Sequence, residues 1–218
     1  MTVAPAFRVG LALAGIVRLG VLAIDGVRIV GRAEAMNAPL ADAEARLRRA
    51  GERPGLVSAV RTMYKRVGID PTKTRPSSEA LLRRVRKGEP LPRVNAAVDV
   101  CNWCSVETQV PYGLYDLDRV EGDVVLRLGT AGEEYAGIRK EVVHLAGRLA
   151  LADGVGPFGN PTSDSARTMV TTASTRVVFV MFVPGELPAR VADDALALTA
   201  GRAARFVGGT IVVREVQS

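Results

Sequence analysis

Cysteine, histidine and aromatic residues are scarce in this 218-residue sequence. Two cysteines cannot build a disulfide framework, which favours a cytoplasmic protein. Cys101 and Cys104 form a C-x-x-C pair, but a structural zinc site needs four ligands and His144 is the sole histidine. Redox pairs begin a helix, whereas this pair falls within one, so we interpret both as buried thiols. The sequence predicts neither a metal nor a cofactor.

Several kinds of catalysis lack their usual motif here. A single histidine argues against serine-hydrolase chemistry, and we expect a surface or packing role for His144. No Walker glycine-lysine loop occurs. Gly154, Gly156 and Gly159 spell G-x-G-x-x-G, but neighbouring prolines disfavour the helix that a dinucleotide site requires.

Long apolar runs are also missing. The stretch from Phe7 to Val27 is apolar, but Arg8, Arg18 and Asp25 interrupt it. A membrane-spanning helix needs about 18 or more apolar residues in a row, and a signal peptide needs an unbroken apolar core. We therefore expect no membrane association and no signal peptide.

Positive charge is concentrated in one part of the chain. Between Arg46 and Arg93 there are fourteen Lys and Arg against four Asp and Glu, while the rest has fifteen against nineteen. Such a segment attracts polyanions, of which nucleic acid is the commonest in a cytosol. A solvated basic helix face explains the composition equally well.

The apolar periodicity predicts one α/β domain over residues 1–218, with a mixed sheet packed by helices. We divide it into N-terminal strands and basic helices (1–90), a core (91–184), and a C-terminal helix and strand (185–218). Residues 17–30 are predicted as one strand or as a hairpin turning at Asp25-Gly26. Further strands are predicted at 123–128, 149–153, 167–172, 176–183 and 210–216. Helices are predicted at 41–50, 55–67, 79–87 (capped by Ser77 or Ser78), 95–109 and 191–207.

A polar stripe marks the predicted helix 95–109. Asp99 and Asn102 are three residues apart and share a face, and a turn-rich segment from Pro111 to Asp116 follows. Such a helix and turn can line a pocket. The same side chains can instead satisfy nearby backbone groups.

The order of these residues resembles a known family. The segment from Leu91 to Glu134 carries N-x-x-V-D-x-x-N, then a proline, then D-L-D-x-x-x-G. It is similar to the editing and tRNA-binding domain of the phenylalanyl-tRNA synthetase β subunit, and the likeness covers about residues 88–184. The preceding YKRVGIDPTKTRPSSEALLRRV looks like the leader of free-standing family members. The motif positions are Asn95, Val98, Asp99, Asn102, Pro111, Asp116, Leu117, Asp118 and Gly122.

The resemblance implies an α/β fold that hydrolyses mischarged aminoacyl-tRNA. Asn102 matches the pocket asparagine of the family. The family's histidine falls at Gly113, and its tyrosine-reading glutamate falls at Val180 or Met181, so both are missing. An apolar pocket discriminates poorly between side chains that differ by one hydroxyl, so tyrosine-specific editing is not expected.

These considerations assign candidate roles. Asn102 and Asp116 are the catalytic candidates, with Asp164 as a second carboxylate able to orient water. The substrate-binding candidates are Asp99, Gly113, Asn160, Ser163, Asp164 and Ser165. The tRNA phosphates would meet Lys73, Arg75, Arg83, Arg84, Arg86 and Lys87. The alternative is a non-catalytic module that binds tRNA or a small amino-acid-like ligand.

Overall fold

The computed structural model of the chain describes residues 4–139 and 141–218. Its helices are α1 (Asn37–Ala50), α2 (Pro54–Arg66), α3 (Ser77–Arg86), α4 (Ala96–Thr108) and α5 (Arg190–Phe206), with 3₁₀ turns at Leu11–Leu13, Glu34–Met36 and Leu117–Arg119. Its strands are β1 (Phe7–Val9), β2 (Val17–Asp25), β3 (Tyr112–Asp116), β4 (Val124–Leu128), β5 (Glu134–Ala136), β6 (Val142–His144), β7 (Leu149–Ala152), β8 (Pro157–Gly159), β9 (Arg176–Pro184) and β10 (Thr210–Gln217).

The central sheet has the order β10-β2-β9-β3, and every neighbouring pair in it is antiparallel. β2 and β9 pair over their full length, from Val17 opposite Pro184 to Asp25 opposite Arg176. Both strands are apolar on both faces, which is typical of strands buried between two layers. β3 is an edge strand, so one row of its backbone N–H and C=O groups faces away from the sheet.

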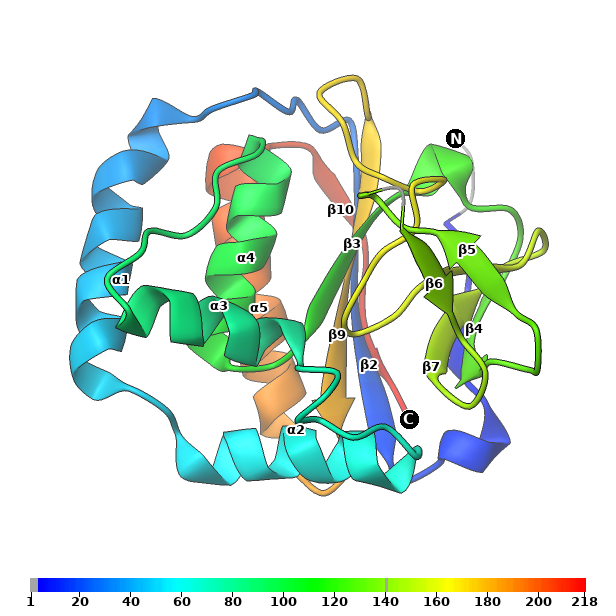
Figure 1. Ribbon diagram of the computed structural model, residues 1–218. Coiled ribbons are helices and arrows are strands. Elements are labelled where there is room, and N and C mark those ends of the chain that lie inside the picture. The colour runs from blue at the N-terminus through cyan, green and yellow to red at the C-terminus, as the bar shows by residue number, and fades with distance from the viewer. Residues whose placement is uncertain (1–3, 140) are drawn as a thin grey trace.

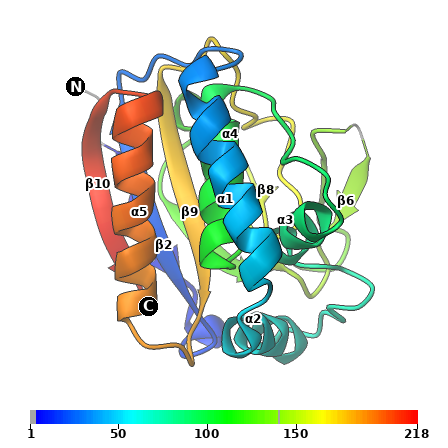
Figure 2. The same cartoon turned by 90° about the vertical axis from the view of Figure 1, so that its left-hand side faces the viewer.

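Three layers build the molecule (Figure 1). Helices α4 and α5 cover one face of the central sheet, and α1 and α3 lie outside α4 (Figure 2). The second sheet, β1-β4-β7-β8, covers the other face, and the β5-β6 ribbon lies beyond it. One apolar core fills the space between the central sheet and the helices, and a second lies between the two sheets and α2.

The α/β class with a sheet packed by helices is confirmed, but the strands form separate sheets. Parallel pairing occurs between β1 and β4, so the mixed sheet is β1-β4-β7-β8 and not the central one. The predicted hairpin at Asp25-Gly26 is wrong. After Gly26 the chain leaves the sheet, because the Val27 and Arg28 amides donate to the distant carbonyls of Thr175 and Val207.

Two predictions near the polar stripe are also wrong. The segment predicted to be turn-rich contains β3, whose five residues are all buried. Residues 167–172 form turns and coil. There the Thr168 carbonyl accepts from the Asp116 amide and the Val170 carbonyl from the Asn95 side chain, so the segment covers the edge of β3.

The predicted helices are confirmed with small shifts of their ends. The helix predicted from Asn95 begins at Ala96, and Asn95 caps it, since its Oδ1 accepts from the Val98 amide at 3.0 Å. The predicted serine cap of α3 is wrong, because Pro76 occupies the N-cap position and Ser77 begins the helix. Throughout residues 4–139 and 141–218, every helix is too short or too polar to cross a bilayer.

Candidate active site

The polar stripe of α4 has one structural residue and one unpartnered residue. Asp99 is buried and its carboxylate accepts from Arg93 at 2.6 Å and from the Val94 amide at 2.8 Å, so it anchors the chain before the helix. Asn102 is half-buried, and its side chain makes no hydrogen bond with any described residue. Its amide is therefore free to contact a ligand.

Gly113 owes its identity to Tyr115. The two residues share a face of β3, and the buried Tyr115 ring lies back over Gly113. A side chain at Gly113, or at Gly159 on β8, would collide with the Tyr115 hydroxyl. Phe158 packs its ring edge against Tyr115, with 5.0 Å between ring centroids. The Tyr115 hydroxyl thus fills the space in which a histidine side chain at position 113 would begin.

Asp164 faces this tyrosine. The Tyr115 hydroxyl donates to Asp164 Oδ1 at 2.7 Å, and the Leu114 amide on the free edge of β3 also donates to the carboxylate. Desolvation raises the pKa of Asp164 to about 7, although these two hydrogen bonds oppose the shift. A half-buried carboxyl with this pKa is able to exchange a proton near neutral pH.

Helix α4 meets the Asp164 loop at the edge of β3. Burial raises the pKa of the Cys101 thiol well above its usual value, and the neighbouring Asp164 carboxylate raises it further. Cys101 and Asp164 are thus close enough to interact, and Asn102 is the next residue on the helix. The candidate site therefore comprises Asp164 and the edge of β3, with Asn102 on the neighbouring helix.

Asp116, the other catalytic candidate, has a structural role, because both of its carboxylate oxygens accept hydrogen bonds from the protein. Its Oδ1 accepts from the Asp118 amide at 3.0 Å and its Oδ2 from the Ser174 hydroxyl at 2.6 Å. The side chain is buried and closes the turn after β3. Between the two carboxylates, Asp164 is the better placed for chemistry.

Among the remaining substrate-binding candidates, some side chains already have hydrogen-bond partners in the protein and one does not. Asn160 is buried, accepts from the Thr162 and Ser163 amides at 2.8 Å each, and donates to the Tyr135 hydroxyl at 2.9 Å. Ser165 accepts from the Arg167 amide at 3.1 Å. Ser163 is exposed, and its hydroxyl has no partner among the described residues.

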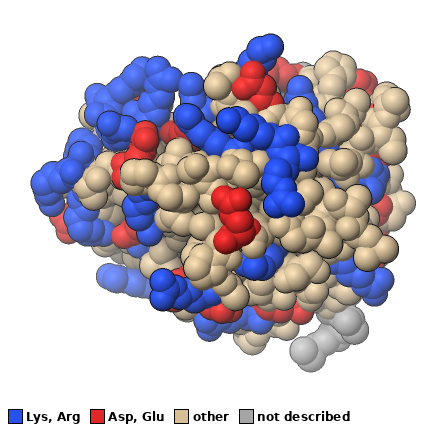
Figure 3. Space-filling view, turned by 90° about the horizontal axis from the view of Figure 1, so that it is seen from below, with Lys and Arg blue, Asp and Glu red and all other residues tan. Residues whose placement is uncertain are grey.

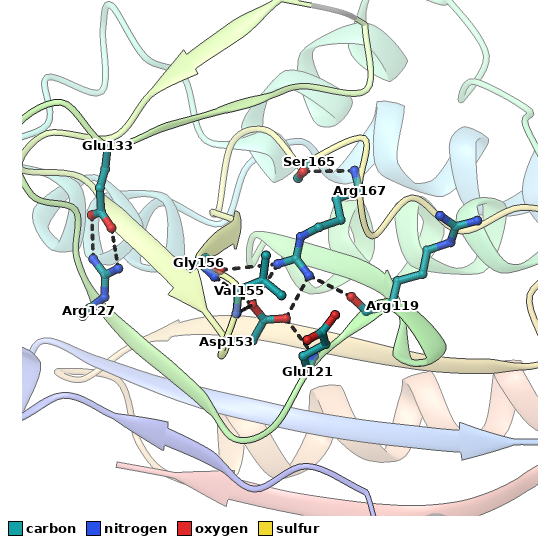
Figure 4. A network of polar contacts seen from close by, with 9 residues as sticks. All are labelled: Arg119, Glu121, Arg127, Glu133, Asp153, Val155, Gly156, Ser165 and Arg167. Carbon is teal, nitrogen blue, oxygen red and sulfur yellow. Dashed lines mark hydrogen bonds and ion pairs between the residues drawn. The ribbon is translucent and has the colours of Figure 1, made fainter.

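An ion-pair network holds the glycine-rich loop, which comprises residues 154–165 (Figure 4). Both carboxylate oxygens of Asp153 accept from the Arg167 guanidinium, at 2.9 Å each. Asp153 also accepts from the amides of Glu121, Val155 and Gly156. Because the Arg167 guanidinium lies 5.5 Å from the centroid of the Phe158 ring, this network also supports the ring that packs on Tyr115.

The basic helices border this loop. The Tyr64 hydroxyl donates to the Pro161 carbonyl at 3.1 Å, and the Ser77 amide donates to the same oxygen at 3.4 Å. Lys and Arg side chains gather on the face that includes α2 (Figure 3).

The RNA-binding candidates differ in whether an acidic side chain of the protein already pairs with their positive charge. Three form ion pairs with acids: Arg75 with Glu79, Arg84 with Glu89, and Arg86 with Glu52. The other three, Lys73, Arg83 and Lys87, form no ion pair with a described residue. These three are the candidates whose charge is most available to an RNA.

Both cysteines are buried and unpaired, as predicted. His144 lies on the surface beside Glu134, with 74% of its side chain exposed, which confirms a surface position. No three His, Cys, Asp or Glu side chains gather as metal ligands within the described residues. Sequence reasoning missed Tyr115, whose only signal was its position two residues after Gly113 on a strand that was not predicted.

The fold is shared with a subunit of an aminoacyl-tRNA synthetase. Over 96% of its length, the chain superposes on 52% of an N-terminal fragment of the phenylalanyl-tRNA synthetase β subunit from Pyrococcus horikoshii, with a TM-score of 0.52 and 15% identity. The chain thus spans about half the length of that fragment. No curated protein matches the sequence.

A sequence profile of the B3/4 domain matches residues 59–210, and the chain belongs to this family. The resemblance to the phenylalanyl-tRNA synthetase β subunit is thereby confirmed. The matched range includes the later part of α2, all of α3 and α5, and the whole candidate site.

Proposed function

We propose that this protein binds aminoacylated tRNA and hydrolyses the ester bond of a mischarged amino acid in trans. The observation that carries the proposal is the Asp164 carboxyl, which has a pKa of about 7 and lies at the edge of β3 opposite α4. Ester hydrolysis at neutral pH requires a group that takes a proton from water and then returns it to the leaving oxygen. Asp164 has the proton affinity for both steps.

The reaction begins with a water molecule beside Asp164. The ionised carboxylate accepts a proton from this water as its oxygen attacks the ester carbonyl carbon. A carboxylate has about four acceptor positions, so the hydrogen bonds from Tyr115 and Leu114 leave room for the water. The protonated carboxyl then donates to the ribose oxygen as the carbon–oxygen bond breaks, and the products are a free amino acid and a free tRNA end.

Asn102 is the candidate to bind the developing oxyanion. Its side-chain amide supplies N–H donors that no described residue uses, and it follows Cys101, the α4 residue that interacts with Asp164. A fixed donor at a developing oxyanion is worth about 10²–10³ in rate. The aminoacyl ester is already activated, so a base and one oxyanion donor are sufficient parts for its hydrolysis.

The proposed site would not recognise a mischarged tyrosine by the hydroxyl of that amino acid. Val180 and Met181 are fully buried in the two apolar cores, and Gly113 is covered by Tyr115. A site that hydrogen-bonds a substrate hydroxyl discriminates strongly, whereas an apolar one does not. We therefore propose that selection depends on the size of the amino acid.

A non-catalytic binding module is the second candidate. The observation that favours it is that both known partners of the Asp164 carboxylate are protein groups, as for a structural carboxylate. On this alternative the chain binds tRNA or an amino-acid-like ligand and leaves the ester intact.

Release of amino acid from a panel of aminoacyl-tRNAs separates the two candidates. Wild type should release amino acid from at least one mischarged tRNA, and Asn102→Ala should reduce the rate about 10²-fold. Binding of tRNA without release by wild type, across the whole panel, favours the binding module. A salt-independent affinity for tRNA would exclude phosphate contacts by the basic helices.

A further inference from the structure

A polar pocket lies beside the proposed catalytic site. It is a small pocket that opens between the segment after α2, the start of β7 and the loop after β8. Its polar lining comes from Thr74, Arg148, Asn160, Thr162 and Ser163, and its apolar lining includes Ile69 and Leu149.

Arg148 has no counter-ion in this pocket. The side chain is half-buried, and its guanidinium makes no hydrogen bond or ion pair with a described residue. The Arg148 charge interacts with the hydroxyl of Tyr135. That hydroxyl stays neutral, because burial raises the pKa of Tyr135. A partly desolvated cation is costly unless it is paired, so this arrangement favours an anionic ligand.

Hydroxyl groups complete the lining. The side chains of Thr74 and Ser163 have no hydrogen-bond partner among the described residues, whereas the Thr162 hydroxyl is bonded to Tyr64 at 3.0 Å. A guanidinium together with hydroxyl donors is the combination that binds phosphate oxygens, because the planar fork matches two of them at once.

The surroundings indicate that the phosphate belongs to a nucleic acid. Thr74 stands between Lys73 and Arg75. Of the two nearest acids in sequence, Asp70 accepts from the Thr72 amide and hydroxyl, and Glu79 is paired with Arg61 and Arg75. Ser163 directly precedes Asp164, so the pocket adjoins the proposed site of ester hydrolysis.

We infer that the pocket of Thr74, Arg148 and Ser163 binds a backbone phosphate of the single-stranded aminoacyl end of an RNA. This inference rests on the proposed function, since it places the RNA strand beside Asp164. A free nucleotide or inorganic phosphate offers the same chemistry, so a test must separate these sources.

The test measures binding of a fluorescein-labelled single-stranded RNA to the full chain by anisotropy, at several salt concentrations. Arg148→Gln should weaken binding about tenfold, as expected for loss of a charge-assisted hydrogen bond. The log–log salt dependence should fall by about 0.7, the value for one phosphate contact in a single strand. Arg148→Lys should retain most of the salt dependence with intermediate affinity.

Two further variants sharpen the result. Ser163→Asp adds a carboxylate to the pocket without removing a hydrogen bond, and should weaken binding as much as Arg148→Gln. Arg32→Gln is the matched control, because it removes an exposed arginine from the segment between β2 and α1, at the other end of the molecule from α2 (Figure 1). It should change affinity less than twofold, and equal unfolding temperatures would show that the variants are folded.

The outcomes are separable from those of the hydrolysis assay. Equal affinities of Arg148→Gln and Arg32→Gln for RNA would overturn the inference. Binding of AMP or inorganic phosphate that depends on Arg148, without binding of RNA, would overturn it too. Arg148-dependent RNA binding by a protein that releases no amino acid would support the pocket and defeat the proposed catalysis.

Discussion

Asp153 and Asp164 stand at two ends of the glycine-rich segment, and their surroundings shift their pKa values in opposite directions. Asp153 is fully buried at its side chain and faces the Arg167 guanidinium. Asp164 is half-buried and has neutral partners, the Tyr115 hydroxyl and the Leu114 amide.

The difference lies in charge compensation. Desolvation raises the pKa of Asp153, but hydrogen bonds from Arg167 and from backbone amides outweigh it, so the net shift is downward. At Asp164 the same desolvation prevails, and the pKa reaches about 7. A paired carboxylate holds a loop in place, whereas an uncompensated one retains a proton that chemistry can use.

The largest expected effect is on catalysis at Asp164. Asp164→Asn keeps the acceptor for Tyr115 but removes the base, so deacylation should fall about 10²–10⁴-fold. Single-turnover release of amino acid from aminoacyl-tRNA measures this. Asp194→Asn, at an exposed position on α5, is the control and should leave the rate unchanged. A fully active Asp164→Asn enzyme would remove Asp164 from the mechanism.

The next effect is on stability at Asp153. Arg167→Met leaves a buried carboxylate without its cation, and should lower the free energy of unfolding by about 3 kcal/mol. Urea denaturation at pH 7 checks this. Arg127→Met is the matched control, because it breaks a two-bond pair with Glu133 that is partly exposed, and should cost about 1 kcal/mol. Equal losses would contradict the distinction between the two pairs.

A smaller effect concerns the pH dependence of stability. The pKa of Asp164 is raised on folding, so its contribution is fully present below about 4 and is lost as pH rises through about 7. Asp164→Asn removes this loss and should be more stable than wild type by about 1–3 kcal/mol at pH 8, with less gain at pH 5. Unfolding free energies at the two pH values measure the difference, and a gain independent of pH would contradict the raised pKa.

Much of the fold was predictable from sequence because its strongest elements are long and periodic. The helix beginning at Asn95, the strand from Arg176 and the C-terminal helix and strand appear where the sequence predicts them. β3 was missed because Pro111 and Gly113 suggest a turn, whereas in the structure Gly113 is required by the Tyr115 ring that covers it.

The site was predictable only in part, since the hydrogen-bond and ion-pair partners of a polar side chain depend on tertiary contacts. Sequence analysis placed Asn102 and both carboxylates among the candidates, but sequence alone did not separate Asp164 from Asp116. That separation follows from Ser174, which donates to Asp116 from a turn after the glycine-rich segment. The unpaired state of Arg148 likewise depends on which acids approach it in space, and no local pattern records that.

The smallest expected effect lies at the hydroxyl that links Tyr115 to Asp164. Its hydrogen bond to the carboxylate lowers a pKa that burial has raised, so Tyr115→Phe should raise the pKa of Asp164 above about 7. The pH–rate profile of deacylation, which should rise with pH around 7 in wild type, should move to higher pH in the variant. The Asp153 network should be unaffected, because Phe keeps the ring that packs against Phe158. A profile that loses amplitude without moving would mean that Tyr115 acts on the substrate directly, and that the proton affinity of Asp164 is set by burial alone.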